Sequence, residues 1–161
     1  MALRYYEKEY PEINECVVIR VKLIKDTAIY VDLFEYDIEG MILFSEISRR
    51  RFSSINKITK VGNIEVATVL RISGSSDQRI YIDLSRKQVS IEDTNKCLEN
   101  YNKSKIVFSI IENFSKLTRM NVIDANKLII WPLHKKNINV FDLFFEVSDT
   151  LPIDIIGSGV P

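Results

Sequence analysis

The 161-residue sequence has few of the residue types on which cross-linking, secretion and membrane insertion depend. It contains two cysteines, Cys16 and Cys97, which are far apart and lack a C-x-x-C partner, so neither a zinc knuckle nor a disulfide framework is expected. No run approaches the roughly 18 apolar residues of a membrane-spanning helix, and the N-terminus lacks the apolar stretch of a secretory signal. Apolar residues still make up 46% of the chain. We therefore expect a cytosolic protein with a buried core and no membrane association.

Motifs for catalysis and cofactor binding are missing as well. Only five glycines are present, and no GxxxxGK[ST] or GxGxxG phosphate loop occurs. The single histidine, His134, lies beside two lysines, where a surface position is far more common than a catalytic one. Nothing in the spacing pairs it with a cysteine nucleophile, and the carboxylates are scattered. The sequence therefore predicts no enzyme, no metal site and no cofactor.

Charge is unevenly distributed although its sum is zero. Residues 1–44 carry 5 basic and 9 acidic side chains, residues 45–88 carry 9 and 4, and residues 89–161 carry 8 and 9. A basic central block in a neutral chain indicates one electropositive surface, as proteins that bind nucleic acid or phosphate have. Lysines and arginines scattered over a solvated loop are the alternative.

Alternation of apolar and polar residues predicts five short strands in the first half of the chain. The candidate strands are residues 16–25, 27–34, 39–44, 64–72 and 79–85. An irregular stretch follows the third, and the turn-forming SGSSDQ precedes the fifth. Five short strands in this order favour a small closed barrel. The residues expected to face its interior include Val17, Ile19, Val21 and Leu23, then Ile29, Val31 and Leu33, then Ile64, Val66, Thr68, Leu70 and Ile72, and finally Ile80, Ile82 and Leu84.

The apolar period changes from strand-like to helical at Ser90. Ser90 and Asp93 have the spacing of a capping box. Beyond them Ile106, Ile110, Phe114 and Leu117 recur at helical intervals and predict a buried stripe. A shorter helix is expected from Asp124, ended by Pro132, then an amphipathic segment with Val140, Leu143, Phe144 and Val147, and a frayed IIGSGVP terminus. Trp131 is expected in a helical core. We predict two domains, a barrel at residues 1–87 and a helical domain at residues 88–161.

The segment EGMILFSEISRRRFSSINK, residues 39–57, stands out from the rest of the chain. Ser48 is followed at once by Arg49, Arg50 and Arg51. Three adjacent guanidinium groups repel one another and cannot all find buried partners, so an exposed loop is expected. Such a loop suits RNA phosphates, which arginine grips in a bidentate manner. It also suits a basophilic kinase, because a phosphate on Ser48 adds about −1.5 to −2 charges beside the arginines. A plain solvated loop, with Ser48 as a cap, is the alternative.

This segment, with IYIDLSRKQVS, NKSKIVFSI and the opening RYYEKEYPEINECVVIRVKLI, resembles the alpha subunit of eukaryotic translation initiation factor 2. The resemblance extends from about Arg4 to Phe114. It implies an S1-type OB barrel followed by a helical domain. It also implies a subunit of a GTP-binding heterotrimer that delivers initiator methionyl-tRNA to the small ribosomal subunit. The implied partners are the beta and gamma subunits, initiator tRNA, the small ribosomal subunit and messenger RNA.

The resemblance also implies a regulatory role for the serine before the arginine triplet. Stress-responsive kinases of this family phosphorylate that serine, here Ser48, and the phosphorylated factor then binds its guanine-nucleotide exchange factor unproductively. The kinase-docking strand usually has the motif KGYIDLS, and Arg79, Tyr81 and Asp83 match it, whereas Ile80 replaces the glycine. A β-branched side chain obstructs the close approach that glycine allows. The C-terminal α/β domain that joins the gamma subunit has no counterpart in this sequence, which suggests an N-terminal fragment.

Candidate RNA contacts are less specific than the serine–arginine motif. Lys57, Lys60, Arg71 and Lys87 are expected to extend the basic surface, with solvated charges as the alternative. The aromatic side chains of Tyr30, Phe34 and Tyr36 are candidates for stacking on RNA bases, with packing as the more common role. The competing function is a generic OB-fold RNA-binding module of another RNA-processing complex. A pseudosubstrate decoy for the kinases is disfavoured because Ser48 is present.

Overall fold

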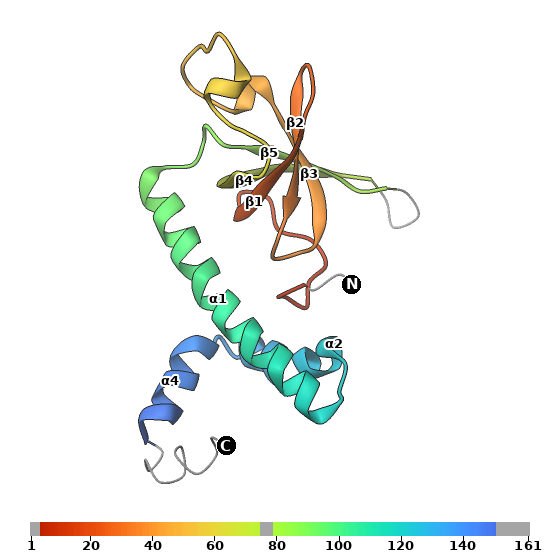
Figure 1. The fold of residues 1–161 in the computed structure, drawn as a ribbon, viewed down its shortest axis with the longest axis vertical. Coiled ribbons are helices and arrows are strands. Elements are labelled where there is room, and N and C mark those ends of the chain that lie inside the picture. Colours follow the sequence, from red (N-terminus) through yellow and green to blue (C-terminus); the bar gives the residue numbers. More distant parts are fainter. Residues whose placement is uncertain (1–3, 75–78, 151–161) are drawn as a thin grey trace. The chain divides into compact units, whose positions relative to one another are not determined.

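A computed structural model describes residues 4–74 and 79–150, except for the side chains of residues 147–150 (Figure 1). The SGSSDQ turn lies partly outside these residues, and the side chain of Val147 and the IIGSGVP terminus lie wholly outside them. The chain divides into two compact units, Met1–Asn102 and Lys103–Pro161. Each unit is described by itself. Of the helices in the described ranges, none combines the length and the apolar character that crossing a membrane requires.

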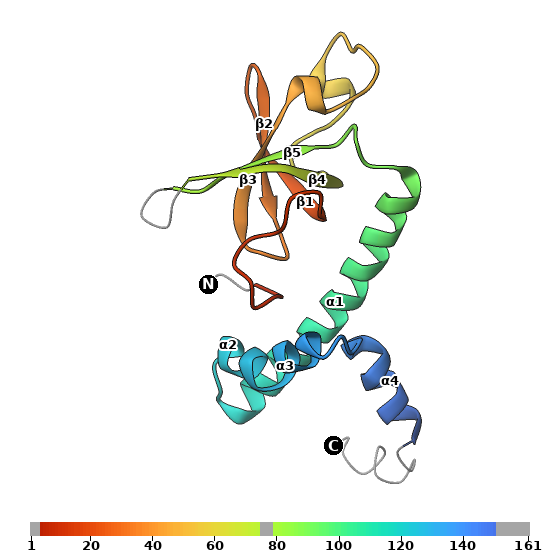
Figure 2. The ribbon, with the colours of Figure 1, turned by 180° about the vertical axis from the view of Figure 1, so that it is seen from behind.

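The first unit is a closed five-stranded barrel, as the sequence predicts. Its strands are β1 (Cys16–Ile24), β2 (Ala28–Leu33), β3 (Ile38–Leu43), β4 (Ile64–Ser73) and β5 (Tyr81–Ser85). The strands close in the order β1-β2-β3-β5-β4. All neighbouring pairs are antiparallel except β3 and β5, which run parallel through Met41 and Asp83. Figure 2 shows the same barrel from behind. This is the S1-type OB arrangement, and it confirms the predicted fold class.

The barrel core consists of branched aliphatic side chains from all five strands. Ile19, Ile29, Leu33, Ile42 and Leu84 are all at most 1% exposed. Branched side chains fit a pleated, closely packed interior, and full burial of each contributes about 1.5–3 kcal/mol. The alternation along residues 27–34 and 79–85 therefore identified the interior rows of β2 and β5 correctly.

Two predicted interior rows are wrong in part, although Val17, Ile19 and Val21 of β1 face the core as predicted. The register of β1 shifts between Val21 and Leu23, and Leu23 is 45% exposed while Ile24 packs on the core. A bulge adds one residue, so every following side chain changes face. In β4 the barrel interior takes Ala67 and Val69 rather than the predicted Ile64, Val66, Thr68 and Leu70. A second shift between Val69 and Arg71 then returns Ile72 to the core side.

The long helix α1 (Ile91–Thr118) begins where the capping pattern places it. The N–H of Asp93 donates to Ser90 Oγ at 3.0 Å, and the Ser90 hydroxyl donates to Asp93 Oδ2 at 2.8 Å. Tyr101, near the end of the part of α1 that belongs to the first unit, stacks on Phe34 at 5.8 Å and on Tyr5 at 6.4 Å. It also covers Val18 and Val66 on the outer wall of the barrel. The first compact unit therefore ends inside α1, at Asn102. The domain boundary between residues 87 and 88 stays a prediction.

The second unit contains the remainder of α1 with α2 (Val122–Ala125), η3 (Asn126–Ile130), α3 (Trp131–Lys135) and α4 (Val140–Thr150). Trp131, 3% exposed, packs in its core with Val107 and Ile111, as expected for the tryptophan. The predicted stripe on α1 is wrong for Ile106, Ile110 and Leu117, which are 47%, 44% and 86% exposed. After Ile106 and Ile110 the buried residues are one position later, Val107 and Ile111, and one residue is about 100° around a helix.

Pro132 does not end the helical segment that precedes it, contrary to the prediction. Asn121 rather than Asp124 caps α2, through its side chain and the N–H of Ile123 at 2.8 Å. The chain then continues through the π-helical turn η3 into α3, with Pro132 in the first turn of α3. A π turn widens the hydrogen-bond spacing, so a residue without an N–H is tolerated there.

Candidate functional site

The segment between β3 and β4 forms an exposed loop at one end of the barrel, and we call residues 44–60 the arginine loop (orange to yellow in Figure 1). It contains two short 3-10 turns, η1 (Phe44–Glu46) and η2 (Ile55–Lys57). Phe44 holds its start, because its N–H donates to the carbonyl of Thr27 at 3.0 Å and its ring meets Phe52 edge-on at 6.2 Å. Ile47 is 2% exposed and belongs to the barrel core. The loop is therefore anchored at its base.

Glu46 joins the base of the arginine loop to the chain that follows β5. Its carboxylate accepts the buried Ser85 hydroxyl at 2.6 Å and pairs with Lys87 Nζ at 3.4 Å. Its main-chain carbonyl accepts the N–H groups of Arg86 and Lys87 at 2.9 and 3.0 Å. One residue therefore binds three successive residues of the neighbouring segment, which fixes the direction in which the loop leaves the barrel.

Ser48 lies just beyond this anchored base, half-buried and outside any helix. Its Oγ accepts the main-chain N–H of Arg50 at 3.1 Å, a local turn of the kind that serine favours. The residue therefore caps no helix, and its hydroxyl is not enclosed in the barrel. Among the described residues, none accepts a hydrogen bond from this hydroxyl.

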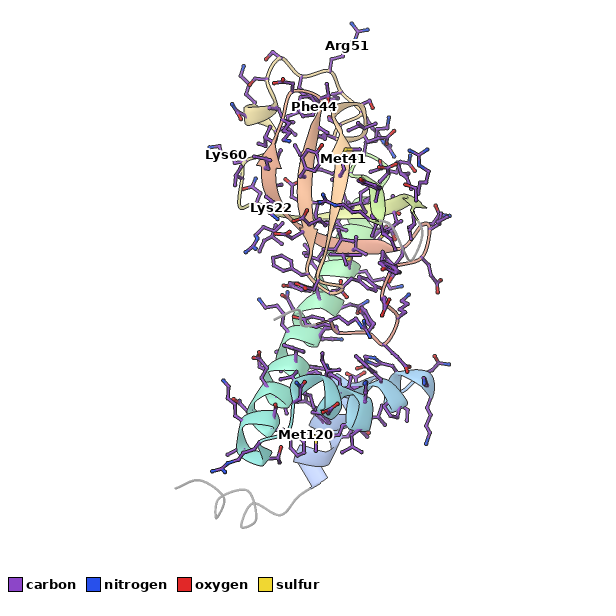
Figure 3. All side chains as sticks on the ribbon, turned by 90° about the vertical axis from the view of Figure 1, so that its right-hand side faces the viewer. Lys22, Met41, Phe44, Arg51, Lys60 and Met120 are labelled. Atoms are coloured by element: carbon purple, nitrogen blue, oxygen red, sulfur yellow. The ribbon has the colours of Figure 1, made fainter. Side chains whose placement is uncertain are left out.

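The three arginines differ in how they are held. Arg49 Nε donates to the main-chain carbonyl of Lys87 at 2.9 Å, which adds a second link between the loop and the segment after β5. Arg50 and Arg51 are exposed, and Arg51 extends away from the barrel in Figure 3. Over residues 4–74 and 79–150, none of the three forms an ion pair. Two guanidinium groups are therefore open to an anionic partner next to Ser48.

The predicted kinase-docking residues lie on one face of the β5 strand and its approach. Arg79 Nη2 pairs with Glu39 Oε2 at 3.2 Å, and Arg79 Cζ lies 6.0 Å from the ring centre of Tyr81. Tyr81 is 59% exposed. Asp83 Oδ2 accepts both Nη2 and Nε of Arg71, at 2.6 and 3.0 Å. The structure therefore brings Arg79, Tyr81 and Asp83 together on the outer surface.

A groove of about 610 Å³ runs beside these residues across β1, β2, β3 and β5. Its lining includes Lys22, Lys25, Tyr30, Met41 and Tyr81. Figure 3 shows Lys22 and Met41 on this part of the barrel. The pKa of Glu39 is lowered and that of Lys22 raised, in both cases chiefly because the two side chains form a hydrogen-bonded ion pair. Sequence reasoning missed the groove, although Lys22 and Tyr81 belong to the outward rows that the strand alternation predicted.

Of the four candidate RNA-binding cations, two are already paired within the chain. Arg71 is bound to Asp83, and Lys87 to Glu46. Lys57 Nζ donates to Ser53 Oγ at 3.3 Å and is otherwise exposed. Lys60 is exposed, projects from the end of the arginine loop in Figure 3, and forms no ion pair with any residue described. The open cations are therefore those of the arginine loop itself.

Of the three candidate stacking aromatics, only Tyr30 is available on the surface. Phe34 packs against Tyr101, as described above, and Tyr36 is 3% exposed with its hydroxyl on Glu15 Oε1 at 2.6 Å. Both side chains pack within the fold, which is the more common role expected for them. Tyr30 lines the groove, with Lys25 Nζ 5.2 Å from its ring centre.

Ile80, which replaces the expected glycine, is half-buried. Its side chain packs against the barrel core. Gly74 lies close to the backbone of Ile80. Its φ is +115°, and a Cβ added to it would lie 3.0 Å from Ile80 Cα. The side chain thus adds apolar contact at one end of the groove. In the described ranges, no three histidine, cysteine or acidic side chains are grouped to hold a metal ion.

Comparison with known proteins agrees with this arrangement. The S1 RNA binding domain family matches residues 10–87. Among solved structures, the intact alpha subunit of aIF2 from Pyrococcus abyssi has a TM-score of 0.78 at 25% identity, covering 96% of this chain and 58% of that one. The a/eIF2alpha chain of Pyrococcus horikoshii, solved with aDim2p and rRNA, has a TM-score of 0.73 at 24% identity, covering 94% and 89%.

Two relatives identify the family. Subunit 1 of eukaryotic translation initiation factor 2 from Plasmodium berghei (strain Anka) is 43% identical over 154 residues, 95% of this chain and 46% of the relative. The subunit alpha homolog from Arabidopsis thaliana is 44% identical over 155 residues, 96% of this chain and 44% of the relative. The chain thus spans less than half the length of these relatives. It belongs to the family of eukaryotic translation initiation factor 2 alpha subunits, non-catalytic subunits of a translation initiation factor, and corresponds to their N-terminal portion with its S1 RNA-binding domain.

Proposed function

We propose that the chain acts in the cytoplasm as the N-terminal regulatory part of the alpha subunit, within the GTP-dependent factor that delivers initiator methionyl-tRNA to the small ribosomal subunit. Ser48 is its phosphorylation switch. The observation that carries this proposal is the placement of the Ser48 hydroxyl on an anchored loop, followed directly by three exposed arginines without ion pairs among the described residues.

Phosphorylation of Ser48 reverses the local charge balance. A phosphate adds about −1.5 to −2 charges and three acceptor oxygens, which Arg50 and Arg51 are placed to bind in a charge-assisted manner. Because Glu46 and Arg49 hold the base of the loop, the change stays confined to the exposed part. The altered surface is what the guanine-nucleotide exchange factor would bind unproductively, so that general translation falls.

The remaining functional residues have supporting roles in this proposal. Arg79, Tyr81 and Asp83 form the docking surface for stress-responsive kinases, on a face separate from the acceptor serine. Lys57 and Lys60, with the arginines, contact RNA backbone of the small ribosomal subunit, messenger RNA or initiator tRNA. The beta and gamma subunits are partners of the chain in the factor, and the contact to the gamma subunit needs the C-terminal domain of the family, in the part of the relatives that this chain does not span.

The test is phosphorylation of the chain by a stress kinase of this family, with the sites mapped by mass spectrometry. We expect one labelled residue, and Ser48→Ala should abolish the labelling. Ser45→Ala is the matched control, because Ser45 also offers a hydroxyl at the start of the loop, where it is exposed, but lacks arginines directly after it. Undiminished labelling of Ser48→Ala would reject the assignment.

A generic OB-type RNA-binding module is the second candidate, supported by the S1 match and by the groove that Tyr30 and Tyr81 line. Such a module would bind single-stranded RNA with an affinity that falls steeply with salt, since bound phosphates release counterions. Its affinity would also be the same for wild type, Ser48→Ala and the Ser48-phosphorylated chain. A loss of RNA affinity confined to the phosphorylated chain would instead support the switch.

A further inference from the structure

The arginine triplet has a second serine at its other end. Ser53 follows Arg51 after one intervening residue, so that Arg50 and Arg51 stand three and two positions before it. Phe52 between them is half-buried against Phe44, whereas Arg51 and Ser53 on either side are exposed. The phenylalanine thus holds this part of the loop to the barrel and leaves its two neighbours directed to solvent.

The environments of the loop serines differ. Ser48 is half-buried, and its Oγ accepts the N–H of Arg50. Ser53 is exposed, and its Oγ accepts Lys57 Nζ at 3.3 Å from the 3-10 turn η2. Ser54 is half-buried, with no side-chain bond to the turn that it precedes. Ser53 therefore combines accessibility, two arginines on its N-terminal side and a lysine already at its oxygen.

We propose that Ser53 is a second phosphorylation site, taken by protein kinases that select arginine on the N-terminal side of the acceptor. Kinases discriminate substrates by matching acidic pockets to basic residues at fixed positions. Transfer forms a bond between Ser53 Oγ and the γ-phosphorus of ATP and breaks the bond from that phosphorus to the β–γ bridging oxygen. ADP leaves, and the hydroxyl proton passes to the catalytic carboxylate of the kinase. This site does not depend on the proposed role of Ser48.

Lys57 gives the product a binding partner. A phosphate on Ser53 places its oxygens within reach of the ammonium group that now donates to the hydroxyl, and the bond becomes charge-assisted. Arg50 and Arg51 then lie between two possible phosphates, one at each end of the triplet. Neither arginine has an ion pair with any other described residue, so both are free to bind either phosphate.

The experiment incubates the 161-residue chain with ATP and the catalytic subunit of cyclic-AMP-dependent kinase, which selects arginine two and three positions before its serine. Sites are mapped by mass spectrometry. We expect phosphate on Ser53, a loss of at least tenfold in rate for Ser53→Ala, and unchanged rates for Ser54→Ala and Ser48→Ala. The double variant Arg50→Ala/Arg51→Ala should also lose at least tenfold, whereas Lys60→Ala, at another exposed cation of the loop, should not. Absence of labelling, or phosphate on Ser54 or Ser48 instead, overturns the proposal.

A second measurement tests the role of Lys57. In the fully phosphorylated chain, acetylation of Lys57 by a small amine-reactive ester should slow several-fold relative to Lys60, because the phosphate holds the amine protonated and covered. An unchanged ratio overturns the predicted pairing. Labelling of Ser48 by a stress kinase is measured in parallel. Failure at Ser53 with success at Ser48 rejects only this second site, and the reverse result rejects only the proposed switch.

Discussion

Glu46 offers a direct test of how the arginine loop is held, because a single carboxylate connects it to the segment after β5. In Glu46→Ala the Ser85 hydroxyl loses its acceptor at 2.6 Å, while Ser85 itself is 0% exposed. Among the residues that the structure describes, the only other acceptor for this hydroxyl is the main-chain carbonyl of residue 46, at 3.5 Å. Leaving a buried hydroxyl without a good partner costs about 1–3 kcal/mol. The partly exposed pair with Lys87 adds about 0.2–1 kcal/mol.

We therefore expect Glu46→Ala to lower the free energy of unfolding of the barrel by about 2 kcal/mol. Glu46→Gln keeps an oxygen for Ser85 and loses only the charge, so its cost should stay below about 1 kcal/mol. Glu39→Ala is the matched control, since its carboxylate also pairs with cations but lies on the exposed outer face. A change of at most about 0.5 kcal/mol is expected there.

The two units allow the measurement to be localised. All seven tyrosines lie within residues 1–102, whereas the single tryptophan, Trp131, lies in the second unit. Urea unfolding followed by tyrosine absorbance should shift in Glu46→Ala, and unfolding followed by tryptophan fluorescence should not. If Glu46→Ala is no less stable than Glu39→Ala, the argument that Glu46 anchors the loop is refuted.

Three further outcomes are expected. Ile80→Gly should speed phosphorylation by a typical kinase of the family, because it removes the β-branched side chain beside the docking surface; an unchanged rate would show that docking tolerates isoleucine. Burial raises the pKa of Glu35 in the folded chain. The stability that Glu35 contributes is therefore fully present below the pKa of glutamate in the unfolded chain, and it is lost as pH rises through the folded-state pKa. Glu35→Gln should flatten that decline of the urea midpoint as pH rises above about 4, the usual pKa of a glutamate in an unfolded chain. The pKa of native Glu39 is lowered, so Glu39→Gln should instead remove a decline towards acid. Gly40→Ala should lower the free energy of unfolding of the barrel by about 1–3 kcal/mol, because the new Cβ would lie 2.7 Å from Leu84 Cδ1. Calorimetry measures this change, and an unchanged melting temperature would show that Leu84 moves aside.

Much of the fold was predictable because alternation and capping are local properties of the chain. Period-two patterns located all five strands, and Ser90 with Asp93 located the start of α1. The errors have identifiable causes. A bulge is a property of two paired strands, so the pattern of β1 alone did not reveal that Leu23 turns outward. In β4 both faces carry buried apolar residues, Val66 on the outer wall and Val69 in the interior, so its pattern did not decide which face points inward. The buried side of α1 is likewise chosen by the helices that pack on it, and Val107 and Ile111 were as apolar as the residues predicted.

Local sequence was sufficient for the identity of the candidate site, because three adjacent arginines repel one another and stay on the surface wherever they occur. The segment around Ser48 was therefore predictable as a cationic surface loop. The resemblance to the family could also be recognised from short contiguous stretches of sequence. Only the tertiary structure decided which of those charges remain open. Arg71 and Lys87 are neutralised by acidic side chains 12 and 41 positions away, and Tyr36 is buried against Glu15. Such pairings depend on closure of the barrel, which brings distant strands into contact and has no signature in any single stretch of sequence.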